Sequence, residues 1–319
     1  MANAANIWRD TATGLERYRL ENDVLRLELT NAGAAMISLY MNAGEARDLI
    51  LGYDNTERYL DNQTYFGAVV GRFAGIIPNA VANCDGEEFR LTKNDGEHHL
   101  HGGVKGLSFR LWRADIDGDT LCFRYESRDG EEGYPGKAEF EVRYRLVGNR
   151  IEVEYAADCD RPCPLNLTLH PYFNLNGHAC GCLDGHMLRI GSSRYFKSDA
   201  KGAAIKGEIP AQGGYNFQTL MPLQDIAYDN YYIVDDGGYA AELYAEPSGI
   251  IMRLSCTQPG IQLYSADGLM DTGKGGVLYG RRSGICLEPQ EYPWIVNPNL
   301  YIRYHHKIQY EFDYIPYRE

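Results

Sequence analysis

Residues 140–155 read FEVRYRLVGNRIEVEY, a stretch in which apolar and charged side chains alternate. A period of two places the apolar residues on one face of a β-strand and the charged residues on the other. Gly148-Asn149 interrupts the alternation with residue types that favour a tight turn. We therefore predict a half-buried antiparallel hairpin over this stretch.

The same period recurs far from this hairpin. Apolar residues alternate again over Leu25–Leu29, Leu121–Tyr125 and Ile308–Tyr314. A second hairpin is predicted within residues 240–265, with Glu246-Pro247-Ser248-Gly249 as its turn. These patterns are typical of sheets that bury one face and expose the other to water.

Helical patterns are short. We expect single helical turns at residues 57–62 and 222–226, and the chain has no long amphipathic helix, internal repeat or low-complexity linker. The sequence thus predicts an all-β protein with one domain over residues 1–319. We expect two large antiparallel sheets packed face to face.

The composition narrows the choice of partners. The 319 residues carry a formal net charge of -13, which disfavours nucleic acid and anionic membranes and suits a neutral small molecule. No apolar run is long enough to span a membrane. Residues 1–10 lack the basic and apolar regions of a secretory signal, so we expect a cytoplasmic protein that is a monomer or homodimer.

One short segment contains four possible metal ligands: His178, Cys180, Cys182 and His186. The Cys-x-Cys spacing is not that of structural zinc sites, and a second pair of ligands is not apparent. We expect a surface loop here and no metal site. The eight cysteines are too few for a disulfide scaffold in a chain of this length, so we expect free thiols.

Two runs offer groups for proton transfer. Residues 164–175 read PLNLTLHPYFNL and contain His170, while residues 284–290 read GICLEPQ and contain Glu288. An imidazole and a carboxylate held in apolar strands can act as an acid/base pair. Without other information the structural reading is favoured, in which His170 is a hydrogen-bonded histidine at a strand end and Glu288 is a paired structural carboxylate.

Further runs lie in order along the chain: YFGAVVGR (65–72), HLHGGVKG (99–106), EEGYPG (131–136), Tyr228-Asp229-Asn230 and QPGIQLY (258–264). Together the runs resemble those of the aldose 1-epimerase (galactose mutarotase) family. The resemblance implies a β-supersandwich and a cofactor-independent isomerase that interconverts the anomers of a hexose or modified hexose. It also implies that Glu288 is the base at the C1 hydroxyl and His170 the acid at the ring oxygen. A nearby negative charge is expected to help keep His170 protonated.

The resemblance also implies substrate-binding residues: His101, Asp229, Gln262 and Arg72. The alternatives are a turn histidine, a turn aspartate and, for Arg72, an ion pair at the edge of the core. Two other functions remain open at this point. One is a non-catalytic sugar-binding or regulatory protein, and the other is a glycoside hydrolase that pairs Glu288 with Asp229.

The chain departs from the family pattern at a few positions. Gly75 and Ile76 occupy the place of an Asn-Arg pair that reaches the sugar, Leu169 replaces an Asn, and Trp294 replaces an Asp. Ile lacks the fork of donors that Arg carries. We therefore expect the preferred sugar to differ from plain galactose.

Overall fold

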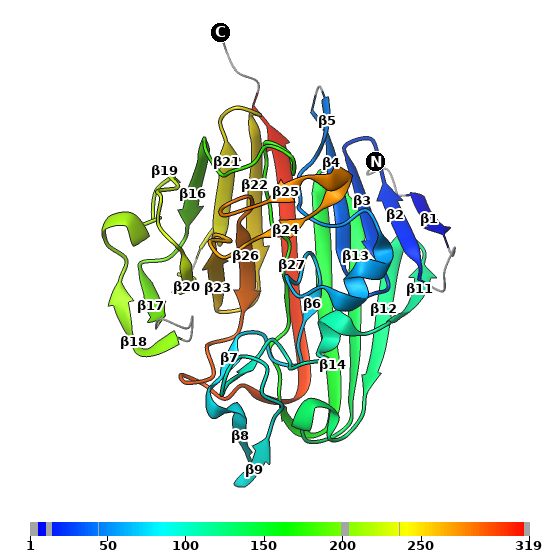
Figure 1. The fold of residues 1–319 in the computed structure, drawn as a ribbon, viewed down its shortest axis with the longest axis vertical. Coiled ribbons are helices and arrows are strands. Elements are labelled where there is room, and N and C mark those ends of the chain that lie inside the picture. The colour runs from blue at the N-terminus through cyan, green and yellow to red at the C-terminus, as the bar shows by residue number, and fades with distance from the viewer. Residues whose placement is uncertain (1–5, 11–14, 44, 199–203, 236, 316–319) are drawn as a thin grey trace.

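The computed structural model describes the chain except for 1–5, 11–14, 44, 199–203, 236 and 316–319. Residues 1–10, in which no secretory signal is expected, thus lie partly outside the described residues. Strands dominate the fold (Figure 1). No helix among the described residues is long and apolar enough to cross a membrane.

The largest sheet has nine antiparallel strands. Their order is β11 (Arg113–Asp117), β12 (Thr120–Ser127), β13 (Ala138–Val147), β14 (Arg150–Pro164), β27 (Leu300–Tyr314), β22 (Ile250–Cys256), β21 (Ala241–Ala245), β16 (His186–Ile190) and β19 (Met221–Pro222). The hairpin predicted at residues 140–155 is confirmed as β13 and β14, with Val147 opposite Arg150. The second predicted hairpin is β21 and β22. The C-terminal strand β27 joins the two halves of the sheet, because it pairs with β14 on one side and β22 on the other (Figure 1).

Two five-stranded sheets face this large one. The first contains β1 (Asn6–Asp10), β2 (Arg17–Glu21), β3 (Leu25–Thr30), β4 (Met36–Ala43) and β5 (Glu45–Asp48) in chain order. The second has the order β18 (Ala204–Pro210), β17 (Arg194–Ser198), β20 (Asp229–Ile233), β23 (Gly260–Tyr264) and β26 (Cys286–Gln290). In Figure 1 the first lies on the side of β11–β14 and the second on the side of β16, β21 and β22.

The core lies between these layers. Tyr18 of β2 packs edge-to-face on Phe123 of β12, with 5.7 Å between ring centroids. On the other side, one apolar cluster joins Leu263 and Leu287 of the second small sheet to Leu243 of the large sheet. The predicted supersandwich is therefore confirmed, although its second layer is divided into two sheets. That residues 1–319 form one domain stays a prediction.

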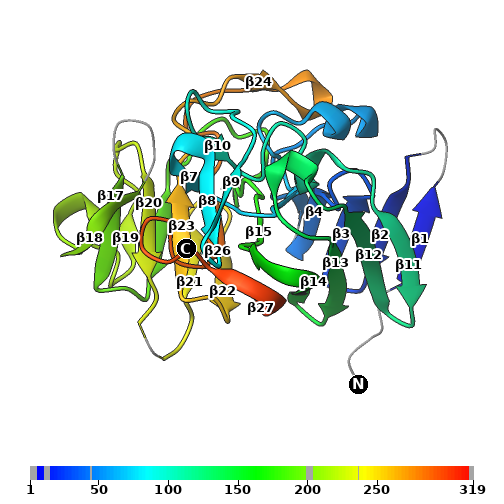
Figure 2. The ribbon, with the colours of Figure 1, turned by 90° about the horizontal axis from the view of Figure 1, so that it is seen from below.

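Short elements connect the sheets. Four two-stranded pairs are β6 (Val69–Val70) with β15 (Thr168–Leu169), β7 (Ile76–Ile77) with β10 (His99–Leu100), β8 (Val81–Cys84) with β9 (Glu87–Arg90), and β24 (Asp271–Thr272) with β25 (Leu278–Tyr279). The described part of the chain also forms six 3₁₀ turns: η1 (Thr56–Asp61), η2 (Pro78–Ala80), η3 (Leu107–Phe109), η4 (Glu131–Gly133), η5 (Gly213–Tyr215) and η6 (Lys274–Gly276). Seen from below, β24 lies on the far side of the molecule from β27 (Figure 2).

The two predicted helical turns had different outcomes. The turn predicted at residues 57–62 is confirmed as η1, which is capped by the Asn55 side chain. The turn predicted at residues 222–226 is wrong, because Met221–Pro222 forms edge strand β19 beside β16. An edge strand tolerates Pro222, which has no N–H to donate to a neighbouring strand.

Candidate active site

A cavity of about 460 Å³ opens over one face of β20, β23 and β26. Side chains alternate between the two faces of a strand, so residues two apart share a face. Asp229 and Tyr231 of β20, Gln262 and Tyr264 of β23, and Glu288 and Gln290 of β26 all line the cavity. The register places Gln262 directly opposite Glu288. The sheet thereby arranges a row of polar groups beneath the cavity.

His170 reaches the cavity from a different part of the fold. It follows β15, and its backbone N–H donates to the Ala68 carbonyl (3.1 Å) while its carbonyl accepts from Gly67 N–H (3.0 Å). Gly67 has a φ of +62°, and a Cβ there would lie 2.0 Å from the Met36 carbonyl oxygen. Only glycine fits such a position, so the YFGAVVGR run serves to fix the backbone of His170.

His170 and Glu288 form a buried pair. His170 Nε2 lies 3.4 Å from Glu288 Oε1, and the two side chains are 5% and 2% exposed. Burial lowers the pKa of His170 to about 4. Burial, together with the charge of Asp229, raises the pKa of Glu288 well above its usual value. Both shifts have the same cause, because desolvation favours the neutral form of each group.

This result corrects the expectation that a nearby negative charge keeps His170 protonated. Burial lowers the pKa of the imidazole in the empty cavity, and only a backbone hydrogen bond opposes this shift. The depth of burial of His170 arises only from the assembled fold.

Asp229 and Gln262 interact directly. Gln262 Nε2 donates to Asp229 Oδ1 at 2.5 Å. Burial raises the pKa of Asp229 to about 6, and the hydrogen bond from Gln262 opposes this shift. The pair presents one amide and one carboxylate to the cavity, which suits the recognition of hydroxyl groups.

His101 is held in a defined tautomer. The imidazole Nδ1 accepts a hydrogen bond from Gly75 N–H (3.1 Å), and the backbone N–H of His101 donates to the Gly75 carbonyl (3.1 Å). Burial lowers the pKa of the imidazole well below its usual value. A neutral ring whose Nδ1 accepts must carry its proton on Nε2, so His101 can donate to a ligand in the cavity that it lines.

Comparison with known proteins now adds to this geometry. Residues 16–300 match the family model described as aldose 1-epimerase. The chain belongs to the aldose 1-epimerase family. It is an isomerase, a mutarotase that interconverts the α- and β-anomers of a sugar. The comparisons do not favour a non-catalytic sugar-binding protein or a glycoside hydrolase.

Relatives of this aldose 1-epimerase cover most of its length. Galactose mutarotase of Bos taurus is 35% identical, with 89% of this chain and 87% of the relative covered. Aldose 1-epimerase of Escherichia coli K12 is 30% identical, covering 86% and 87%. The crystal structure of an aldose epimerase homologue from C. elegans is 24% identical, with a TM-score of 0.88 over 98% of this chain and all of the other.

The structure brings five of the six predicted site residues of this epimerase together and places Arg72 elsewhere. Arg72 is buried and does not line the cavity. Its guanidinium donates to Ser127 Oγ, Cys163 Sγ and the carbonyls of Ser127, Arg128, Pro135 and Gly136. The alternative of an ion pair is also incorrect, because these partners are not carboxylates. All three guanidinium nitrogens donate hydrogen bonds, so the Arg72 side chain links its own segment to residues 127–128, residues 135–136 and Cys163.

The predicted loop at residues 178–186 does not gather its four possible ligands into one site. His178 Nδ1 lies 2.8 Å from the Tyr279 hydroxyl, and His186 Nε2 accepts from Leu175 N–H. Among the described residues, the ligand atoms that do cluster, within 4.8 Å of one another, belong to His170, Cys286 and Glu288. These residues could hold a cation, although they are also the groups suited to proton transfer.

Three residues of the epimerase site were not predicted. Cys286 Sγ lies 3.5 Å from His170 Nδ1, and Gln290 Nε2 donates to Glu288 Oε2 (3.1 Å). The Asn166 side chain donates to the Ala74 carbonyl and accepts from Glu291 N–H, which joins two walls of the cavity. The period of two around Glu288 could have indicated Cys286 and Gln290. No sequence signal pointed to Asn166, because its partners are distant in the chain.

Proposed function

We propose that Glu288 and His170 are the acid/base pair that opens and recloses the sugar ring. The observation that carries this proposal is their 3.4 Å separation in the wall of the cavity, with both side chains almost fully buried. Two groups this close to each other at the wall of one cavity can exchange protons with two oxygens of the same sugar. Both side chains are held in place, Glu288 by strand β26 and His170 by its two backbone hydrogen bonds.

The proposed reaction conserves protons. The Glu288 carboxylate removes the proton of the C1 hydroxyl while protonated His170 donates one to the ring oxygen. The bond between C1 and the ring oxygen breaks, C1 becomes an aldehyde carbon, and the C1–C2 bond rotates. Closure from the other face reverses both transfers, so the pair returns to its starting state. Each positioned transfer contributes on the order of 10² to 10⁴ in rate.

In the empty site burial lowers the pKa of His170 and raises that of Glu288, whereas ring opening requires the shared proton to lie on His170. The total number of protons on the pair does not change, and the transfer spans the 3.4 Å between Oε1 and Nε2. Sugar hydroxyl groups supply hydrogen bonds to both charged groups. Such bonds favour the charged forms that burial disfavours in the empty site.

We propose that His101, Asp229 and Gln262 bind the sugar hydroxyl groups. His101 supplies a donor, Asp229 an acceptor and Gln262 both. Among the described residues that line the cavity there is no Lys or Arg. This supports a neutral aldose as substrate, a hexose or modified hexose. We propose that no cofactor takes part, because the two proton transfers use side chains alone. Several relatives bear the name galactose mutarotase, so galactose belongs in any first panel.

The cellular setting is also a proposal. All eight cysteines are free in the structure, which suits a reducing compartment such as the cytoplasm. The net charge of -13 supports a small-molecule partner in place of nucleic acid or an anionic membrane. We propose a monomer or a homodimer, with each cavity formed by one chain.

Polarimetry tests the proposed function. Freshly dissolved α-anomers of glucose and galactose should reach equilibrium faster with the protein than in matched buffer, in proportion to protein concentration. The same preparation should release no reducing ends from a glycoside. Rates equal to the spontaneous background for every sugar would contradict the proposal.

A further inference from the structure

We infer that the cavity contains an apolar subsite, formed by Phe73, Ile76, Leu100, Trp294 and Ile295, that binds an alkyl substituent of the aldose. The substrate class is therefore a neutral aldose in which a hydroxyl is replaced by hydrogen or carries a methyl group. This inference rests on the proposed function, because the sugar must occupy the same cavity.

Two strands form one wall of the subsite. Ile76 of β7 stands directly opposite Leu100 of β10, and both side chains line the cavity. Directly opposed residues of an antiparallel pair project on the same side of the sheet. The two aliphatic side chains thus form a continuous surface.

The segment after β26 forms the second wall. Trp294 packs edge-to-face on Phe73, with 5.5 Å between ring centroids, and Phe73 is only 1% exposed. Trp294 is less buried and therefore presents the accessible part of this aromatic pair. Ile295, which follows it, is 42% exposed and also lines the cavity.

The subsite borders the sugar and not the reacting atoms. Gly75, which lies in the chain between Phe73 and Ile76, is close to two polar side chains of the cavity. Its N–H donates to His101 Nδ1, and a Cβ at this position would lie 3.5 Å from Gln290 Oε1. His101 and Gln290 in turn adjoin the acid/base pair, with 5.6 Å between the His101 and His170 ring centroids and 3.1 Å from Gln290 Nε2 to Glu288 Oε2. A substituent here would not block proton transfer.

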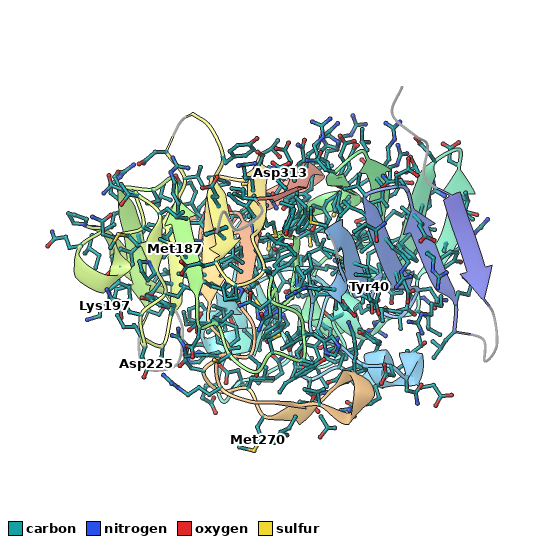
Figure 3. All side chains as sticks on the ribbon, turned by 90° about the horizontal axis from the view of Figure 1, so that it is seen from above. Tyr40, Met187, Lys197, Asp225, Met270 and Asp313 are labelled. Carbon is teal, nitrogen blue, oxygen red and sulfur yellow. The ribbon has the colours of Figure 1, made fainter. Side chains whose placement is uncertain are left out.

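The size and rim of the cavity also favour an enlarged sugar. A volume of about 460 Å³ lies within the range of roughly 300 to 1,000 Å³ that is typical for drug-sized ligands, which exceed a hexose in size. At the mouth, Met270 is 85% exposed and projects from the edge of the molecule beside the β24 segment (Figure 3). Apolar side chains clustered at a cavity mark a binding surface.

Charge excludes one alternative. Asp95 is an acidic residue that lines the cavity, and it lies in the segment just before β10. Its carboxylate repels a sulfonate, phosphate or carboxylate on the sugar, and the described cavity wall offers no Lys or Arg to bind one. The subsite therefore suits an uncharged alkyl group.

The test compares mutarotation of glucose with that of its monomethyl ethers at C2, C3, C4 and C6, and of 6-deoxyglucose and glucuronic acid. We expect at least one ether or the deoxy sugar to exceed glucose in kcat/KM by roughly 4-fold or more, as expected for one buried methyl group. Glucuronic acid should fall below glucose. The position of the preferred ether identifies the carbon that faces the subsite.

Substitutions in the subsite test whether it causes the preference for the alkyl-substituted sugar. Trp294→Ala and Ile76→Asn should each reduce the ratio of kcat/KM for the preferred sugar to that for glucose by at least 3-fold. This ratio cancels any general loss of activity within one variant. The control is Ile302→Ala, at a residue of β27 that is 52% exposed and lies outside the cavity lining.

The outcomes separate the two proposals. If the protein accelerates glucose but no alkyl derivative exceeds it, or if both variants keep the ratio unchanged, the subsite is overturned while the acid/base proposal stands. If the protein accelerates no sugar at all, the proposed function fails, and this inference fails with it.

Discussion

Gln262 stands directly opposite Glu288 across β23 and β26, and its side-chain amide donates to Asp229 on the next strand. Three strands thus connect the proposed base to a second carboxylate whose charge raises the pKa of Glu288. The sheet register, and not proximity in the chain, sets the electrostatics of the site.

Replacing Glu288 with Gln should abolish most turnover. The amide keeps the shape of the carboxyl group but cannot accept the proton, so we expect kcat to fall by roughly 10² to 10⁴. Sugar affinity, measured by calorimetry, should stay within a few-fold. His170→Asn should lower kcat similarly. Near-normal mutarotation by both variants would show that this pair is not the acid and base.

The pH profile should report the buried imidazole. If the working pair holds one proton, kcat/KM is lost when His170 binds a second, which its pKa of about 4 places at acidic pH. We expect a descending limb near pH 4, after subtraction of the spontaneous rate, with activity restored on return to pH 7. A limb near pH 6.5 would instead indicate an imidazole exposed to water.

Asp229 should make stability depend on pH. Its folded pKa of about 6 exceeds the usual 3.8, so its contribution is fully present below about pH 3.8 and is lost as pH rises through 6. Asp229→Asn should therefore gain in free energy of unfolding relative to wild type between pH 4 and pH 7.5, by at most about 3 kcal/mol. Urea unfolding at both pH values measures this, with exposed Asp117→Asn as control. An equal difference from wild type at the two pH values would contradict the prediction.

Arg72 should matter for folding and not for sugar binding. Arg72→Met removes the donor from three buried carbonyl groups and one partly buried carbonyl group, and we expect the free energy of unfolding to fall by roughly 3 kcal/mol or more. The control is Arg113→Met, because the side chain of Arg113 is 80% exposed. In the folded fraction, KM should stay within a few-fold. A large rise in KM without loss of stability would restore Arg72 as a ligand of the sugar.

Removal of metal should leave the rate unchanged. The proposed proton transfers use His170 and Glu288 directly, and a cation held by these residues and Cys286 would compete for the same atoms. Dialysis against a strong chelator, followed by polarimetry, measures this. Activity lost on dialysis and regained with zinc would mean that the cluster is a metal site.

The strands themselves could be predicted from the sequence. The alternation in residues 140–155 and around Leu121 and Ile308 is local, and burying one face of each strand stabilises only one orientation of its side chains. The motif residues His170, Glu288, His101, Asp229 and Gln262 could likewise be selected in advance. The turn at residues 222–226 could not be excluded, because pairing with β16 overrides a weak local preference.

The sequence by itself determined which strands form, which face of each is apolar, and which residues carry groups for proton transfer. Only the tertiary structure decided where those groups meet and how they titrate. The pKa values of His170 and Glu288 depend on desolvation by every segment that covers them. The guanidinium of Arg72 likewise donates to carbonyl groups of residues that are distant in the chain, so the sequence around Arg72 does not predict these partners. Local patterns fix side-chain direction, whereas burial and charge are properties of the assembled fold.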